Sequence, residues 1–281
     1  MSNQKSFAYF GTPYVSRDTL ALLVEAGYVP SVVVTSPDAP KGRGLALMPS
    51  ETKEWALAHG IPVLTPQKLT PEVFAEIAAY GVEYAIVVAY GKILPKSFIE
   101  SFPLGIYNIH YSLLPKYRGA SPVEAVLLND DPVTGVSVQR MAYELDAGDV
   151  IGSMETPIGP LETIRELRPR LIKIGAELLV SLLPRIEAGG IAGTPQDHSL
   201  ATHSGKIRKE EGELAIPGND TLNWRKYRAY AEGPGTYFYT ERNGKRVRVK
   251  IVSASMQDGR FVIERVIPEG KKEMDYADFI R

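Results

Sequence analysis

Residues 84–89 read Tyr-Ala-Ile-Val-Val-Ala, an unbroken apolar and aromatic run. A strand covered on both faces has this pattern, whereas a strand with one face in water alternates apolar and polar residues. The run therefore predicts a central strand in a sheet with helices on both sides. Upstream, apolar runs at 7–10 and 32–34 flank a helical pattern that stops before Gly27. This spacing is typical of a strand–helix–strand unit.

The same alternation continues downstream of residue 34. Apolar periodicity predicts helices at 52–59, 71–80 and 95–102, and strands at 61–64 and 105–109. The first half is therefore expected to be α/β with a mostly parallel sheet. Further along, the sequence predicts a two-stranded hairpin from 134–140 and 150–157, then a long helical segment at 161–188.

The character of the sequence changes after residue 206. Short apolar runs at 235–240, 247–254 and 260–267 are separated by Asn243-Gly244 and Asp258-Gly259. Both dipeptides favour tight hairpin turns, so we expect a small β-rich, barrel-like domain. The predicted domains are 1–190, a polar linker at 191–205, and 206–281.

The composition excludes several kinds of protein. The chain has 281 residues, 44% of them hydrophobic, and no cysteine, so disulfides, thiolate metal sites and cysteine nucleophiles are ruled out. No apolar stretch is long enough for a membrane span or a signal peptide, and we expect a cytoplasmic monomer. Residues 1–200 carry 16 Lys/Arg against 21 Asp/Glu, whereas 201–281 carry 16 against 12. A basic tail on an acidic body favours a polyanionic partner.

Common cofactor motifs are missing. The turn at Gly11-Thr12-Pro13 follows a predicted strand but lacks the G-x-G-x-x-G pattern, and no P-loop or G-x-S-x-G motif is present. The four histidines are scattered, and no H-E-x-x-H motif or thiolate accompanies them, so we expect no metal.

The segment Asn108–Pro122 remains as the best candidate for chemistry. Asn108 and His110 end a predicted strand, and their spacing of two puts both side chains on one face. An amide and an imidazole at that edge suit the stabilisation of a developing oxyanion. Asp146 follows in a turn from which a carboxylate can fold back onto a histidine. From the residues alone, turn or cap roles are favoured about two to one over catalysis.

The same segment, together with Asp146, resembles the folate-dependent formyltransferases. The resemblance extends over nearly the whole chain. It also involves Phe10–Pro13, Ser36–Gly44, Val87–Pro95, Ala201–Ile207 and Pro268–Met274. It implies a Rossmann-like N-terminal catalytic domain and a small, OB-like C-terminal domain.

The resemblance also implies a reaction. The formyl group of 10-formyltetrahydrofolate would pass to the α-amine of methionyl initiator tRNA at translation initiation. Asn108 and His110 would stabilise the oxyanion, and Asp146 would pair with His110. The implied folate contacts are Ser112, Leu113, Leu114 and Pro115, with Tyr90, Gly91 and Ile93 at the pterin. For Tyr90, Gly91 and Ile93, plain core packing is about as good an explanation.

Five basic residues are expected to contact tRNA. Lys41 and Arg43 lie in a glycine-flanked loop, and Lys206 follows the linker. Arg246 and Arg248 alternate with apolar residues, which places them on one face of a strand. A solvated loop or an ordinary half-exposed strand would have the same pattern.

The chain also departs from the family pattern. Tyr111 stands where glycine is usual, Ala147 where threonine is usual, and Glu51 where proline is expected. Tyr111 at that position suggests a narrower site. One alternative function is a sugar-nucleotide N-formyltransferase, which shares Asn108, His110 and Asp146. Others are a binding module without catalysis and a glycinamide ribonucleotide transformylase.

Overall fold

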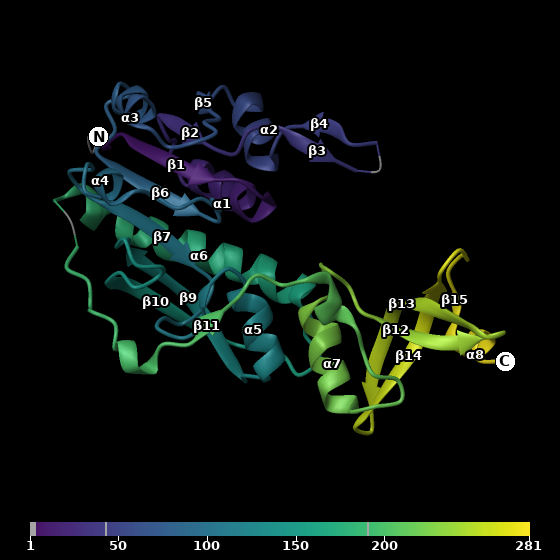
Figure 1. The fold of residues 1–281 in the computed structure, drawn as a ribbon. Helices are drawn as coiled ribbons and strands as arrows, with labels where there is room; N and C mark the ends of the chain where they lie inside the picture. The colour runs from purple at the N-terminus through teal and green to yellow at the C-terminus, as the bar shows by residue number, and fades with distance from the viewer. Residues whose placement is uncertain (1–3, 43, 190) are drawn as a thin grey trace. The chain divides into compact units, whose positions relative to one another are not determined.

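The computed structural model describes residues 4–42, 44–189 and 191–281 (Figure 1). Its main sheet has seven strands in the order β10-β9-β7-β6-β1-β2-β5. The strands from β7 to β5 pair in parallel, and β9 runs antiparallel to β7. The prediction of an α/β fold with a mostly parallel sheet is confirmed. The strands are β1 (Phe7–Gly11), β2 (Val32–Val34), β5 (Val63–Leu64), β6 (Tyr84–Val88), β7 (Ile106–His110), β9 (Val133–Arg140) and β10 (Val150–Pro157).

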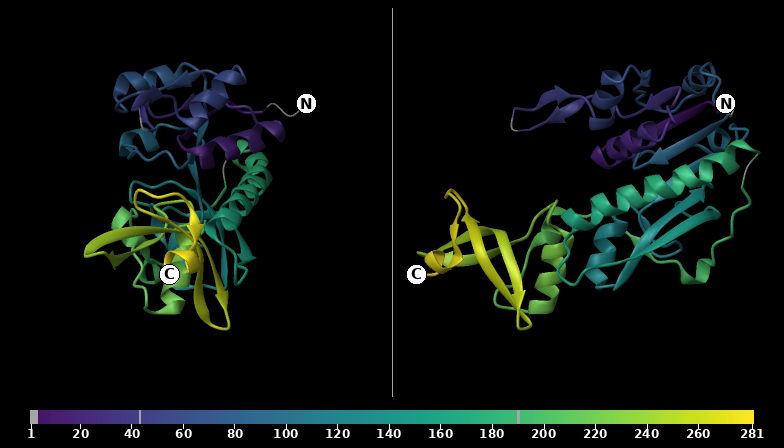
Figure 2. Two further views of the ribbon diagram at one scale, coloured as in Figure 1. Left: turned by 90° about the vertical axis from the view of Figure 1, so that its right-hand side faces the viewer. Right: turned by 180° about the vertical axis from the view of Figure 1, so that it is seen from behind.

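Helices cover both faces of this sheet, which explains the apolar run at 84–89. The side chains of Ala8 and Phe10 pack with Ile77 and Phe98 from the helices on one side. Tyr9 lies between them in sequence, and its hydroxyl donates to the Ser16 carbonyl of α1 on the other side. Figures 1 and 2 show α6 running along the sheet. These helices are α1 (Tyr14–Glu25), α2 (Glu51–Ala58), α3 (Pro71–Ala78), α4 (Lys96–Ile99) and α6 (Ile164–Glu187).

Short local signals set several helix boundaries. The Ser50 hydroxyl accepts a hydrogen bond from the Lys53 N–H at 3.1 Å and caps the first turn of α2. Pro71 occupies the first turn of α3, where the missing N–H costs nothing. Pro169 and Pro184 lie inside α6, which continues through both.

A second sheet forms from the C-terminal part of the chain. It has four strands in the order β12-β13-β14-β15, with antiparallel pairing. Asn243, Gly244, Asp258 and Gly259 all have positive φ, as two-residue hairpin turns require. Both hairpins are where the sequence predicts them. The strands are β12 (Tyr237–Arg242), β13 (Lys245–Gln257), β14 (Arg260–Pro268) and β15 (Met274–Asp275).

Several elements were not predicted from the sequence. They are the hairpin β3 (Ala39–Lys41) and β4 (Ala46–Met48), the pair β8 (Arg118–Gly119) and β11 (His203–Ser204), and the helices α5 (Pro122–Asn129), α7 (Asp220–Ala229), α8 (Tyr276–Phe279), η1 (His198–Leu200) and η2 (Lys209–Gly212). Trp224 of α7 packs with Phe238, Val249 and Phe261 of the second sheet. Among the described residues, no helix is both long enough and apolar enough to cross a lipid bilayer.

The chain divides into two compact units. The first comprises Met1–Arg118, Gly135–Glu155 and Pro169–Thr202, and the second Gly119–Thr134, Thr156–Arg168 and His203–Arg281. The second unit therefore includes two segments that precede its long C-terminal part in the sequence. The domain boundaries proposed from the sequence stay a prediction.

A buried arginine joins three segments of the second unit. Arg228 on α7 is 3% exposed and donates to the Asp130 carboxylate at 3.0 Å. It also donates to the carbonyl oxygens of Glu162 at 2.8 Å and Gly159 at 3.1 Å. One guanidinium thus satisfies acceptors from both early segments of this unit.

Arg228→Met is expected to lower the free energy of unfolding by about 3 kcal/mol, because buried acceptors lose a charged donor. The matched control is Arg225→Met, since Arg225 pairs with the same Asp130 at 3.1 Å but is partly exposed. That change is expected to cost about 0–1 kcal/mol. Urea unfolding followed by circular dichroism measures both, and equal losses would contradict the structural role of Arg228.

Candidate active site

The carboxyl end of β7 presents the two candidate residues side by side. Asn108 and His110 alternate with Ile109 and share the face on which Ile106 packs into the core. They are 9% and 5% exposed, respectively. β7 is a neighbour of the central strand β6 on one side and of the antiparallel strand β9 on the other. Both side chains are therefore positioned by a rigid element rather than by a loop.

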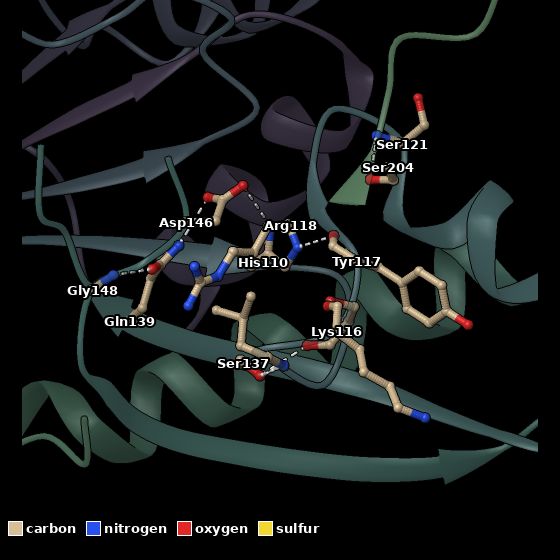
Figure 3. A network of polar contacts seen from close by, with 12 residues as sticks. His110, Lys116, Tyr117, Arg118, Ser121, Ser137, Gln139, Asp146, Gly148 and Ser204 are labelled. Carbon is tan, nitrogen blue, oxygen red and sulfur yellow. Dashed lines mark hydrogen bonds and ion pairs between the residues drawn. The ribbon is translucent and has the colours of Figure 1, made fainter. Parts of the chain in front are cut away.

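His110 contacts protein groups through both ring nitrogens (Figure 3). Nε2 lies 2.9 Å from the Tyr117 carbonyl oxygen. A carbonyl oxygen only accepts, so Nε2 carries a hydrogen. Nδ1 faces the Asp146 carboxylate, with 3.7 Å between Nδ1 and Oδ2. The structure therefore brings His110 and Asp146 together, as the sequence predicts, and leaves Nδ1 as the nitrogen open to proton exchange.

Asp146 lies on the turn between β9 and β10 with a φ of +49°. Its other carboxylate oxygen, Oδ1, accepts a hydrogen bond from Gln139 at 2.9 Å. Gln139 lies directly opposite Asn108 in the β7–β9 pairing. Sequence reasoning missed Gln139, because its position within an alternating strand gives no sign of a polar partner.

The predicted folate-contacting segment follows β7 as a loop fixed by its own backbone and by β9. The Ser112 hydroxyl donates to the Lys116 carbonyl oxygen at 2.6 Å. Ser137 of β9 accepts from the Leu114 N–H at 3.0 Å and donates to the Ser112 carbonyl at 2.8 Å. Ser137 thus determines the path of the loop that also contains Leu113 and Pro115.

The three residues expected at the pterin differ in their surroundings. Tyr90 is 3% exposed and packs edge-on against Phe10, with ring centroids 5.4 Å apart. Burial raises the pKa of Tyr90 to about 12. Gly91 adopts a φ of +76°, and Ile93 is 84% exposed. Tyr90 is therefore part of the hydrophobic core, whereas the side chain of Ile93 is accessible to a ligand.

Tyr111 does not point toward Asn108 and His110. It is 8% exposed, and its hydroxyl lies 3.1 Å from the Thr19 hydroxyl of α1. Because Tyr111 alternates with His110 along the chain, its ring lies on the opposite face of the sheet. The expectation that Tyr111 narrows the site is wrong for this reason.

The Lys41 loop forms the β3–β4 hairpin. The Lys41 ammonium pairs with the Glu51 carboxylate at 3.0 Å and donates to the Pro49 carbonyl at 3.4 Å. Partial burial raises the pKa of Glu51, but hydrogen bonds from Lys41 and the backbone outweigh it, so the pKa is lowered overall. Arg43 lies outside the described residues.

The predicted C-terminal cations are on the surface of the second unit. Arg246 and Arg248 project from β13, and each guanidinium lies 3.8 Å from the centroid of a tyrosine ring. The rings belong to Tyr239 and Tyr237 of the neighbouring strand β12. Lys206 is exposed in the segment between β11 and η2. Both arginine side chains are exposed, and Nη2 of Arg246 also lies 3.8 Å from Oε1 of Glu213. Exposed guanidinium groups stacked on aromatic rings can bind phosphate.

Within the described parts of the chain, no group of three His, Asp or Glu side chains is placed to hold a metal ion. The polar groups at the end of β7 are an amide, an imidazole and a carboxylate. Together they can stabilise a developing oxyanion and accept a proton from a nucleophile.

Comparison with known proteins agrees with this chemistry. The formyl transferase family model matches residues 19–183. A methionyl-tRNA formyltransferase from Koribacter versatilis is 37% identical, over 97% of this chain and 94% of that protein. One from Symbiobacterium thermophilum is 38% identical, over 97% and 90%.

A solved structure shares the fold at much lower identity. The N-formyltransferase from Helicobacter canadensis, in complex with folinic acid and dTDP-3-aminofucose, superposes with a TM-score of 0.64 and 16% identity. The match covers 90% of this chain and 89% of that one. The family model spans more than half of the sequence, and relatives more than a third identical align along almost all of it, so this chain belongs to the formyl transferase family.

Proposed function

We propose that the protein transfers the formyl group of 10-formyltetrahydrofolate to the α-amine of methionyl initiator tRNA, as a cytoplasmic monomer acting at translation initiation. The observation that carries this proposal is the arrangement of Asn108 beside a His110–Asp146 pair with 3.7 Å between Nδ1 and Oδ2. The relatives that align with almost the entire chain are methionyl-tRNA formyltransferases, which supports methionyl-tRNA as the acceptor.

The first step is attack by the amine nitrogen on the formyl carbon. A new C–N bond forms while the carbonyl electron pair moves onto oxygen. Asn108 donates to that oxyanion, and one such donor contributes about 3 kcal/mol to transition-state stabilisation. No nucleophilic side chain is needed, which agrees with the absence of cysteine.

The amine must also lose a proton. His110 accepts it through Nδ1, and the Asp146 carboxylate stabilises the resulting imidazolium. Collapse of the tetrahedral species then breaks the bond from carbon to N10 of the folate, and N10 takes up a proton. The sequence also suggests that His110 donates a hydrogen bond to the oxyanion. Because Nε2 already donates to the Tyr117 carbonyl oxygen, His110 can do so only through Nδ1, once Nδ1 carries a proton.

We place the folate against the loop Ser112–Pro115 and the exposed side chain of Ile93. Ser137 preorganises this loop, so little ordering is required when the donor binds. The folinic acid in the H. canadensis structure supports a folate as donor in this fold.

The second unit is proposed to bind the tRNA as an OB-like module. Arg246, Arg248 and Lys250 alternate along β13 with residues that face the core, such as Val249 and Ile251. In the proposed complex, these cations and Lys206 contact phosphates without reading base sequence. Lys41 contributes only after its ion pair with Glu51 is broken. Arg43 is also proposed to contact the tRNA.

Replacing both Arg246 and Arg248 with alanine is expected to weaken tRNA binding about tenfold and to flatten its dependence on salt by about one unit of slope per lost contact. Filter binding across a range of salt concentrations measures both quantities. Arg260→Ala is the control, because Arg260 is also an exposed arginine but lies on β14. Unchanged affinity and slope in the double variant would remove β13 from the interface.

A formylation assay tests the proposed function directly. Purified protein is given 10-formyltetrahydrofolate with either methionyl initiator tRNA or an amino-sugar nucleotide, and the formylated product is measured. We expect formylation of the methionyl initiator tRNA and no formylation of the amino-sugar nucleotide. Formylation of the sugar nucleotide alone would identify the protein as a sugar-nucleotide N-formyltransferase, and no transfer to either acceptor would overturn the proposal.

A further inference from the structure

Asp146 occupies a left-handed backbone conformation that is uncommon for residues other than glycine. Its φ of +49° lies in the left-handed region, which favours glycine. The residue sits on an otherwise exposed turn, since the preceding Tyr143 and Leu145 are 65% and 66% exposed. A carboxylate that must face His110 therefore needs contacts that fix both its side chain and its backbone.

Gln139 provides the side-chain contact. It is 1% exposed on β9, and its Nε2 donates to Asp146 Oδ1 at 2.9 Å. Its own oxygen accepts from the Gly148 N–H at 3.2 Å, across the same turn. Because one end of the amide meets an acceptor and the other a donor, the network determines its orientation. With Oδ1 engaged, Oδ2 is the oxygen that faces His110.

Gln196 provides the backbone contact. It lies in the segment after α6 and is 8% exposed. Its Nε2 donates to the carbonyl oxygens of Asp146 at 2.9 Å and Gly148 at 2.7 Å. Its Oε1 accepts from Arg118 twice, at 3.1 Å from Nε and 2.7 Å from Nη2. Arg118 follows the loop that begins at Ser112, so Gln196 connects the end of that loop to the Asp146 turn.

We propose that Gln139 and Gln196 are positioning residues for Asp146, with Gln139 orienting the carboxylate toward His110 and Gln196 fixing the backbone of the turn. This inference rests on the proposed function, because it requires Asp146 to act in formyl transfer. Neither glutamine touches the reacting atoms. A misplacement of about 1 Å in a catalytic group can cost on the order of 100-fold in rate.

Two substitutions at Gln139 separate orientation from simple packing. Gln139→Met keeps the shape but removes the donor, whereas Gln139→Glu places a second carboxylate against Asp146. We expect kcat to fall roughly 10- to 100-fold in both variants, with KM for tRNA and folate within about twofold. In Gln139→Glu the two carboxylates share a proton, so the acidic limb of the kcat–pH profile moves to higher pH. His110 is a titratable group that faces Asp146, and Arg118 is connected to the turn through Gln196.

Gln196→Glu tests the backbone contact. A carboxylate there keeps the acceptor for Arg118 but replaces the donor to the two turn carbonyls with a repulsive oxygen. The expected result is a kcat loss similar to that of Gln139→Met, again with KM little changed.

The control is Thr134→Val at the other end of β9. Thr134 is 2% exposed, and its hydroxyl has no hydrogen-bond partner among the described residues. We expect wild-type kcat, KM and pH profile. Provided that the wild-type protein transfers formyl groups, either of two results would overturn the inference. One is a loss of kcat in Gln139→Glu without a shift of the acidic limb, and the other is an unchanged kcat in Gln139→Met. Absence of transfer by the wild-type protein would instead overturn the proposed function.

Discussion

Asn108→Ala is expected to lower kcat for formyl transfer about 100- to 1000-fold, with a much smaller effect on KM. The reason is that the amide of Asn108 donates to an oxygen that becomes negative only as the transition state forms. The ground-state formyl oxygen gains less from the same donor, so binding of the substrates changes little. Steady-state kinetics with methionyl-tRNA and 10-formyltetrahydrofolate measures both constants.

A second variant keeps this test independent of packing. Asn108 is only 9% exposed, so its truncation also leaves a small cavity. Asn108→Asp preserves the shape and replaces the N–H donor with a carboxylate oxygen, which repels the oxyanion. Its kcat is expected to be at least as low as that of Asn108→Ala. Asn129→Ala, at an exposed position on α5, is the control and is expected to behave as wild type. Wild-type turnover in Asn108→Asp would exclude the proposed role.

The sequence predicts those parts of the fold that depend on local patterns. The strand at 84–89 and the hairpin turns at Asn243-Gly244 and Asp258-Gly259 are each specified by a few neighbouring residues. Helix α7 was missed because it mixes charged residues with few apolar ones, and Arg228 reads as a surface residue although it is 3% exposed. Its burial is stabilised by acceptors far away in sequence.

In the candidate site too, features set by neighbouring residues could be predicted, whereas contacts between residues distant in sequence could not. The shared face of Asn108 and His110 could be predicted from their spacing on a strand, whereas their catalytic role was implied by the resemblance and stays a prediction. Gln139 could not be predicted, because its role depends on the antiparallel register that sets it opposite Asn108. Gln196 was hidden in a stretch that reads as a polar linker, yet its side chain is buried against the Asp146 turn. The ion pair between Lys41 and Glu51 was likewise not predicted, because it joins a hairpin strand to the start of a helix. The expected contact of Lys41 with tRNA stays a prediction.

Asp146→Asn is expected to lower kcat by about 100- to 10 000-fold, the range over which a positioned proton acceptor contributes to catalysis. The substitution preserves shape, and the side-chain oxygen of the new amide can still accept from Gln139. What is lost is the negative charge that stabilises a protonated His110. Asp149→Asn, three residues further along and exposed, is the control and should retain wild-type turnover.

Because Asp146 is proposed to act through His110, the two residues should not contribute independently. His110→Ala alone is expected to remove most of the proton transfer, so adding Asp146→Asn to it should reduce kcat little further. If the two single losses instead multiply in the double variant, Asp146 acts on the reacting groups without His110. In that case the distance of 3.7 Å between Nδ1 and Oδ2 would not represent the catalytic contact. The double variant therefore distinguishes a His110–Asp146 pair that takes the amine proton from two groups that each contact the substrate.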